Sequence, residues 1–258
     1  MAKKDTGHHA PKTPRRRHKT EQGETHEHEH EPGVLFGLKL DPMVAELLNR
    51  VEVRSGHLVE TEVGPAADIF PVLSWYDLQK RPHIASSEAK PDIVPLALEL
   101  VRLDFRAGRG EATLPPYEVR NPANQAIARR LYRMVELEVI ISRVEALGAQ
   151  VRSWLIDRHE AGFLKPLGDG KYRPDLDEVA RMRHGVLDAL ELWTADVNEY
   201  DVKRRCGKVG EASGEMGHLL AATTKAISNY RPLDRDKIDS AYYLAIPFLL
   251  EAKRAVHA

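Results

Sequence analysis

The chain has 258 residues, of which 42% are hydrophobic, and it carries 38 basic side chains, 39 acidic side chains and one cysteine. No run of about 18 apolar residues occurs, which excludes a membrane-spanning helix. A single thiol excludes a disulfide scaffold. The hydrophobic content can fill a core, so we expect a globular protein of one or two domains. Because no apolar stretch follows the basic start, no secretory signal is expected, and we place the protein in the cytoplasm or within a virion.

The near-zero net charge conceals an uneven distribution along the first 33 residues. Residues 1–20 hold seven Lys or Arg and one Asp, whereas residues 21–31 hold five Glu and no Lys or Arg. No aliphatic residue larger than Ala follows Met1 in this stretch. Such a segment cannot bury enough apolar area to offset its ordering entropy, so residues 1–33 are predicted to form a disordered arm.

Residues 34–120 are predicted to form a small mixed α/β segment. Asp41 followed by Pro42 is typical of the residue before a helix and the first residue of that helix. The expected elements are, in order, the helix after Asp41, a hairpin over 51–63, an irregular packed segment over 69–76 and a helix over 92–107.

From residue 121 to residue 258 the apolar residues recur at spacings of three and four, which predicts four amphipathic helices. Gly148 and a connection over 162–174 interrupt the pattern, and residues 175–178 resemble a capping box. The last helix is expected to begin at Asp234, and Pro247 is expected to kink it. The predicted fold class is therefore mainly α, with a C-terminal helical bundle or long-helix hairpin domain, a small α+β N-terminal part and the disordered arm.

A dense cationic cluster interleaved with prolines lies in the predicted arm. Flexible cationic segments suit phosphate backbones, because they release counterions without needing a fixed shape. Such contacts bind phosphate and carry no sequence information. The same cluster suits an acidic protein partner or a targeting receptor, and the plainest alternative is a solubilising tail. The arm residues predicted to contact nucleic acid are Lys12, Arg15, Arg16, Arg17 and Lys19.

His26, His28 and His30 alternate with glutamates at the end of the arm. This alternation places the three imidazoles on one side of an extended chain, where they predict weak binding of a transition metal such as Zn, Ni or Cu. A chelate on a disordered chain lacks the surrounding hydrogen bonds that orient metal ligands. The alternative is that the glutamates pair with the arginine cluster and mask it. No other cofactor is expected.

Residues 138–183 carry a pattern typical of a DNA-reading unit: a helix, a turn at Gly148, a second helix, and a small β-wing over 168–173. The alternative is a helical hairpin with a polar loop, which the charge balance favours, because residues 149–183 hold seven basic and six acidic groups. The residues that would face DNA are Arg152, Arg158, Lys171 and Arg173.

Glu215 and His218 form one Glu-x-x-His on an expected helix, whereas ferritin-like di-iron bundles need two such pairs. The glycines at 207, 210, 214 and 217 either line one helix face, permitting a close backbone approach, or belong to a loop. Cys206 has basic neighbours but no evident catalytic partner.

The absence of a catalytic signature favours a non-enzymatic structural or assembly protein that oligomerises through helical faces, as a homo-oligomer or as a component of a larger assembly such as a viral or phage particle. The cationic arm would contact nucleic acid or an acidic partner, and no membrane is expected. The first alternative is a helix-turn-helix-type DNA-binding regulator or packaging protein that uses residues 138–183. The second is a helical metal-dependent enzyme or enzyme subunit that uses His218.

Overall fold

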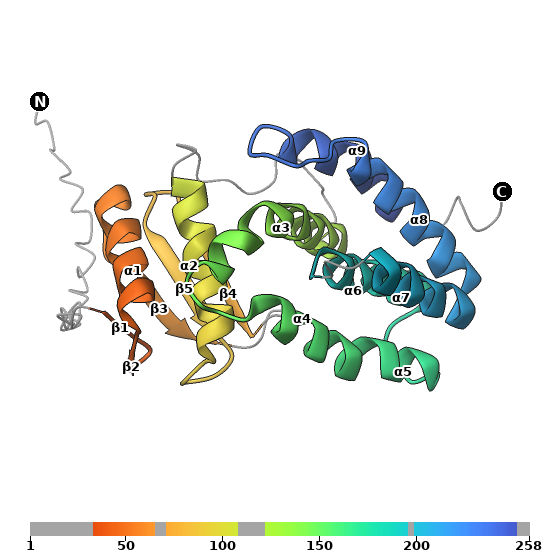
Figure 1. Cartoon of the computed structure of the whole chain (residues 1–258), viewed down its shortest axis with the longest axis horizontal. Coiled ribbons are helices and arrows are strands. Elements are labelled where there is room, and N and C mark those ends of the chain that lie inside the picture. The colour runs from red at the N-terminus through yellow and green to blue at the C-terminus, as the bar shows by residue number, and fades with distance from the viewer. Residues whose placement is uncertain (1–32, 65–70, 108–121, 196–198, 252–258) are drawn as a thin grey trace, which may run out of the picture. The chain divides into compact units, whose positions relative to one another are not determined.

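The computed structural model describes residues 33–64, 71–107, 122–195 and 199–251 (Figure 1). Helices make up most of this part of the chain and a small sheet part accompanies them, which confirms the predicted mainly α fold class. None of the helices in these ranges is both long and apolar enough to cross a membrane. Except for Gly33, the predicted arm lies outside the described residues.

Two small sheets and two helices form the N-terminal part. The elements are β1 (Val34–Leu35), β2 (Leu38–Lys39), α1 (Pro42–Ser55), β3 (Glu60–Val63), β4 (Val72–Tyr76), β5 (Pro82–Ser86) and α2 (Ile93–Ala107). β1 and β2 are an antiparallel pair. The second sheet has the order β3-β5-β4, with β3 parallel and β4 antiparallel to the central β5.

Helix α1 begins where the sequence predicts and ends later. The Asp41 carboxylate accepts hydrogen bonds from two backbone N–H groups of the first turn, and Pro42 is the first helical residue. The predicted hairpin over 51–63 is wrong, because Val51 is completely buried and continues the apolar face of α1. Gly56, with φ of +72°, closes the helix in the left-handed conformation, and β3 follows.

The predicted irregular segment over 69–76 is also wrong for its second half, which forms β4. Pro71 precedes this strand, so its missing N–H does not interrupt the ladder. β4 is an edge strand of its sheet. β5 has no counterpart among the sequence predictions, and it begins at Pro82, a position where a strand tolerates proline.

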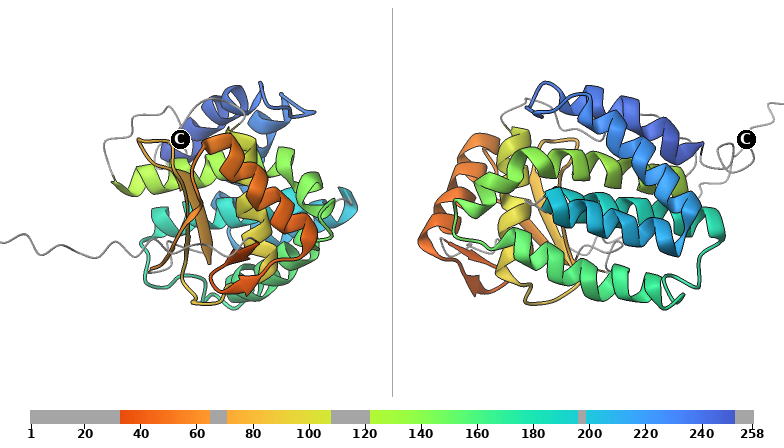
Figure 2. Two further views of the ribbon diagram at one scale, coloured as in Figure 1. Left: turned by 90° about the vertical axis from the view of Figure 1, so that its left-hand side faces the viewer. Right: turned by 45° about the vertical axis from the view of Figure 1, so that its right-hand side comes forward.

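Helix α2 confirms the predicted helix over 92–107 and lies in the interior of the N-terminal part. It packs against α1, β4 and the first helix of the C-terminal part (Figures 1 and 2). Every residue from Pro95 to Arg106 is buried. The hydrophobic core is continuous across the described residues, from Leu35 in β1 to residues near the C-terminus.

The C-terminal part is helical throughout. Its elements are α3 (Pro122–Glu145), α4 (Val151–His159), the π-helix η1 (Glu160–Leu164), α5 (Lys165–Gly168), α6 (Glu178–Ala195), α7 (Glu199–Ala212), α8 (Gly214–Ser228) and α9 (Ile238–Leu250). Helix α3 packs against α2, α6 and α9. Helices α7 and α8 form a hairpin, and α8 also packs against α6 and α9 (Figure 2).

The break at Gly148 occurs as the sequence predicts, since this glycine has φ of +82° between α3 and α4. The predicted β-wing is wrong, because residues 168–173 form the end of α5 and a turn instead of strands. Tyr172 is buried in this segment and its ring packs edge-on against Phe163 of η1. Burial of this aromatic ring therefore anchors the connection to the helical core.

Two predicted helix starts are displaced in the structure. The carboxylate that caps α6 belongs to Asp177, which accepts a hydrogen bond of 2.8 Å from the N–H of Ala180, and Asp175 does not hold this place. Asp234 forms the turn before α9, which itself begins at Ile238. Both predicted starts lie within a few residues of the observed ones. The predictions are displaced because an Asp side chain suits a turn as well as a helix cap.

The glycines between 207 and 217 lie in two helices that approach closely. A Cβ atom on Gly217 of α8 would lie 2.7 Å from the Cα atom of Gly210 in α7. The close backbone approach expected from the helical interpretation is therefore confirmed, but the glycines lie on two helices and not along one face of a single helix. A Cβ atom on Gly207, in contrast, would have no neighbour within 4 Å.

Candidate functional site

The most unusual chemistry of the described residues lies in the core, where two groups of ionisable side chains are buried against α3. The α2–α3 cluster consists of Glu99, Arg102, Arg106, Arg133 and Glu136. The α3–α6 cluster consists of Arg130, His159, Asp188 and Glu191, together with the hydroxyl of Tyr172. Buried charges are costly unless they are paired, so both groups call for an explanation.

In the α2–α3 cluster, Glu136 is completely buried and receives two arginines. Arg106 donates from Nε and Nη2 to the two carboxylate oxygens at 2.9 Å, and Arg102 donates from Nη1 to Oε2. Glu99 accepts from Arg133 at 2.5 Å. Glu99 also accepts from the backbone N–H and the hydroxyl of Ser74, which ties β4 to α2.

The pKa values in this cluster follow from its excess of cations. Burial opposes ionisation of Glu136, but Arg106 and Arg102 outweigh it and lower the pKa of Glu136 to about 2. Burial, together with Arg102 and Arg106, lowers the pKa of Arg133 to about 10, although Glu99 acts in the opposite direction. Three arginines face two glutamates, so the α2–α3 cluster carries one net positive charge.

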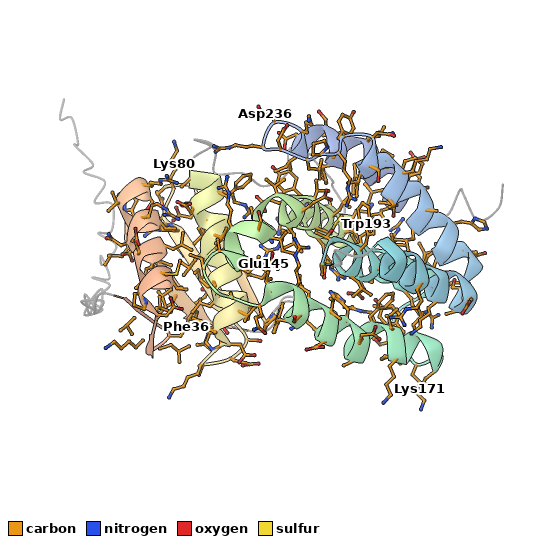
Figure 3. The ribbon with its side chains drawn as sticks, in the orientation of Figure 1. Phe36, Lys80, Glu145, Lys171, Trp193 and Asp236 are labelled. Atoms are coloured by element: carbon orange, nitrogen blue, oxygen red, sulfur yellow. The ribbon has the colours of Figure 1, made fainter. Side chains whose placement is uncertain are left out.

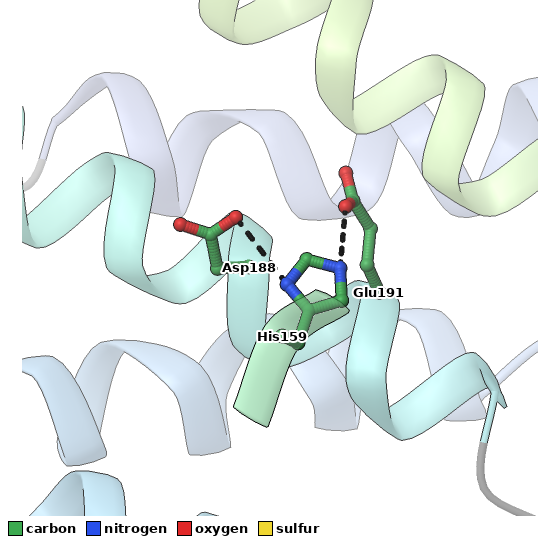
Figure 4. A group of neighbouring side chains, drawn as sticks. All are labelled: His159, Asp188 and Glu191. Carbon is green, nitrogen blue, oxygen red and sulfur yellow. Dashed lines mark ion pairs between the residues drawn. The ribbon is translucent and has the colours of Figure 1, made fainter. Parts of the chain in front are cut away.

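In the α3–α6 cluster, one arginine bridges two carboxylates. Arg130 donates from Nη2 to Asp188 Oδ1 at 2.5 Å and from Nε to Glu191 Oε1 at 3.1 Å. The Nε2 atom of His159 lies 3.0 Å from Glu191 Oε2, and its Nδ1 atom lies 3.7 Å from Asp188 Oδ1 (Figure 4). The Tyr172 hydroxyl donates to Asp188 Oδ2.

Local structure explains how these side chains meet. Asp188 and Glu191 are three residues apart on α6, so they lie on one face of that helix. His159 is the last residue of α4, directly before η1. A π-helix turn is rare and frequently occurs at functional sites.

The ratio of arginines to carboxylates in this cluster is the reverse of that in the first. Burial opposes ionisation of Glu191, but Arg130 and His159 outweigh it and lower the pKa of Glu191 to about 2. Burial and the neighbouring Asp188 raise the pKa of the Tyr172 hydroxyl, so this group stays a hydrogen-bond donor. One arginine faces two carboxylates here, and the imidazole lies between those carboxylates.

The residue types of the α3–α6 cluster are those of a transition-metal site. One ligand atom from each of His159, Asp188 and Glu191 lies within 4.8 Å of the others, and in the described part of the chain no other group of this kind occurs. Imidazole nitrogen and carboxylate oxygen are common ligands of Zn, Fe and Mn. The sequence analysis did not identify these residues.

Two of the four residues predicted to read DNA, Arg152 and Arg158, have internal contacts in the structure. Arg152 pairs with Glu145 at 3.0 Å and donates to the carbonyl groups that end α6. The guanidinium of Arg158 lies over the ring of Trp154. Lys171 is exposed and its side chain projects away from the helices, whereas Arg173 is half-buried (Figure 3). Their role in DNA binding stays a prediction.

The other predicted sites fall outside the buried clusters. Lys12, Arg15, Arg16, Arg17 and Lys19, and the histidines His26, His28 and His30, lie outside the described residues, as does the side chain of Cys206. Glu215 and His218 lie in α8 with exposed side chains, away from the ligand group formed by His159.

A different kind of surface lies on α9. Tyr243, Leu244 and Phe248 are 40–42% exposed, and Pro247 between them is exposed as well. The opposite face of α9 is buried against α3 and α8. We call the four residues the α9 outer face; it carries no charged side chain. A helix that is apolar all round is normally buried on all sides.

No family model, curated protein or solved structure matches the chain.

Proposed function

We propose that this chain is a structural or assembly protein that associates with further copies of itself through the α9 outer face. The observation that carries the proposal is the exposure of Tyr243, Leu244 and Phe248 on a helix whose opposite face is already in the core. Aromatic residues are enriched and charged residues are depleted at the centres of protein interfaces. An apolar, charge-free helix face of this kind supports helix-to-helix association.

A pair of such faces related by a two-fold axis would pack the same patch of each copy against that of the other. This arrangement is the commonest form of homo-oligomer, because one self-complementary patch serves both subunits. Burying a Leu or Phe side chain contributes about 1.5–3 kcal/mol. A contact built on α9 alone is small, so further surface must contribute to a stable dimer.

The cationic arm supplies the second half of the proposal. Its cluster of arginines and lysines favours contact with nucleic acid or another polyanion, as in a viral or phage particle. Several copies of the arm on one oligomer would act together, since linked sites raise the effective concentration for each other. The support for this part is the sequence of the arm.

The first experiment is the native mass of the full chain by sedimentation over a wide range of concentrations. We expect an oligomer for the unmodified chain and a shift to monomer in Leu244→Glu and in Phe248→Glu. Val53→Glu is the matched control, because Val53 is an exposed apolar residue on α1, 73% accessible. A monomer at every concentration, or equal effects of the three substitutions, would refute association through α9.

The second experiment measures the salt dependence of binding to duplex DNA. Replacing Arg15, Arg16 and Arg17 with Ala is expected to weaken binding at every sequence and to reduce the salt dependence. Binding that survives this change and is lost in Lys171→Ala would favour the alternative, a DNA-binding regulator or packaging protein built on residues 138–183.

A further inference from the structure

The α3–α6 cluster contains more carboxylates than arginines. Arg130 is the one arginine in direct contact with Asp188 and Glu191 among the described residues. Arg158 acts on both carboxylates only at longer range, and its guanidinium lies over Trp154. An isolated buried negative charge is expensive, so a cation is favoured beside these carboxylates.

The place for this cation is the side of Glu191 that faces His159. The two atoms there, Nε2 of His159 and Oε2 of Glu191, are buried and 3.0 Å apart, yet neither makes a well-aligned hydrogen bond. Both residues are at most 2% exposed. Two ligand atoms that each lie about 2.1 Å from one metal ion are 3.0 Å apart when they subtend an angle of about 90°.

The surrounding donors match those of an oriented metal site. Arg130 holds one oxygen of each carboxylate, and the Tyr172 hydroxyl holds the second oxygen of Asp188. Carboxylates that bind metals are regularly held by such outer hydrogen bonds. Glu191 Oε2 is left to face the imidazole.

We propose that Nε2 of His159 and Oε2 of Glu191 bind one divalent transition-metal ion, of the Mn²⁺, Fe²⁺ or Zn²⁺ class, in the core between α4 and α6, and that Asp188, which faces Nδ1 of the ring, orients the imidazole. Arg130 and Tyr172 act as positioning residues for the carboxylates. The site does not involve the α9 outer face, so a test of metal binding is independent of a test of the proposed oligomer.

Metal binding by the arm must be removed before this site is tested. A full-length chain with His26→Ala, His28→Ala and His30→Ala is therefore the reference protein. It is loaded with Mn²⁺ and separately with Zn²⁺, dialysed, and analysed for metal per chain, and its affinity is measured by titration calorimetry. We expect one ion per chain.

In the reference protein, Glu191→Gln and His159→Gln are expected to abolish binding at this site. Asp157→Asn is the matched control, because Asp157 is an exposed carboxylate on α4 two residues from His159, and it should leave the affinity unchanged. Tyr172→Phe, which keeps every ligand, should weaken binding by about 10- to 100-fold. That variant keeps the proposal testable if the ligand substitutions unfold the protein.

Two results would overturn the proposal. One is the absence of bound metal in the reference protein under both loading conditions. The other is the same stoichiometry and affinity in folded Glu191→Gln or His159→Gln as in the reference protein. In either case the cluster is an internal network of ion pairs and hydrogen bonds that binds no metal.

Discussion

Helix α3 has ionic clusters on two of its faces, and the two clusters combine arginines and carboxylates in opposite proportion. Toward α2, Glu136 and Glu99 are surrounded by three arginines. Toward α6, Asp188 and Glu191 share Arg130. The first cluster is supplied with cations by its own side chains, and it joins β4, α2 and α3 as a structural element. The second has fewer arginines than carboxylates, and it is the one that contains a histidine and adjoins a π-helix.

This difference teaches that burial alone does not identify a functional site. Both clusters are nearly inaccessible to solvent and both hold their glutamates at a lowered pKa. What distinguishes them is the ratio of arginine to carboxylate, because a cluster with more carboxylates than arginines can accept an additional cation.

The largest expected effect is the loss of stability when one buried glutamate of each cluster is replaced with glutamine. Glu136→Gln leaves Arg102 and Arg106 buried without their carboxylate, and we expect a loss of about 3–5 kcal/mol in the free energy of unfolding. Glu191→Gln relieves an excess of negative charge and keeps the Arg130–Asp188 pair, so the expected loss is about 1–3 kcal/mol. Urea unfolding in a metal-free buffer measures both.

Glu138→Gln provides the control for this comparison. Glu138 lies on the same helix and pairs with Arg231, but that pair is partly exposed, so the cost should not exceed about 1 kcal/mol. Equal losses in Glu136→Gln and Glu191→Gln would show that charge balance does not separate the clusters.

The next largest expected effect is the loss of stability at low pH. The pKa of Glu136 is lowered from its ordinary value of 4.5 to about 2, and that of Glu191 likewise. The folded chain therefore binds fewer protons than the unfolded chain between these values. Stability is fully present above pH 4.5 and falls as the pH drops toward 2, by about 1.4 kcal/mol per pH unit for each such proton.

Urea unfolding at a series of pH values tests this linkage. The decline in stability between pH 4.5 and pH 2 should be less steep in Glu136→Gln and in Glu191→Gln than in the unmodified chain. An unchanged slope in both variants would mean that these carboxyls titrate normally in the folded protein.

The smallest expected effect is the difference in stability lost when the hydroxyl group is removed from one of two tyrosines, Tyr172 or Tyr76. Tyr172→Phe removes a donor to a buried carboxylate, and we expect a loss of about 1.5–3 kcal/mol. Tyr76→Phe removes a donor to the backbone carbonyl of Leu103 near the first cluster, and about 0.5–1.5 kcal/mol is expected. Thermal or urea unfolding of the two variants gives the comparison, which fails if Tyr76→Phe costs more.

Local signals predicted the helical elements better than the strands. The signal of Asp41 followed by Pro42 depends only on contacts within one helical turn, so it predicts the start of α1 correctly. Val51 and Val53 favour a strand by their branching, but the apolar spacing of α1 prevails, because Val51 packs into the core. Strand β5 pairs in parallel with β3, which lies before β4 in the chain, and no local sequence pattern shows this pairing. Its antiparallel pairing with the preceding strand β4 is local, and the sequence interpretation missed it because Pro71 argues against a strand over 69–76.

The buried clusters were missed because their partners come from distant parts of the chain. His159 and Glu191 lie on different helices, and sequence spacing does not show which faces meet. One signal was available: Asp188 and Glu191 interrupt an otherwise apolar run from Val186 to Leu192. A charged residue inside such a run marks a buried carboxylate that needs a partner.

The enclosure of α2 has a consequence for the motions of the native protein. Its residues from Pro95 to Arg106 are covered by α1, β4 and α3 together. If one of these neighbours opens locally, the other two still cover the helix. The backbone amides of α2 should therefore exchange with deuterated water only through nearly complete unfolding, whereas those of β1 and β2 exchange through local opening. In this sense α2 is the segment whose exchange reports the global stability of the fold.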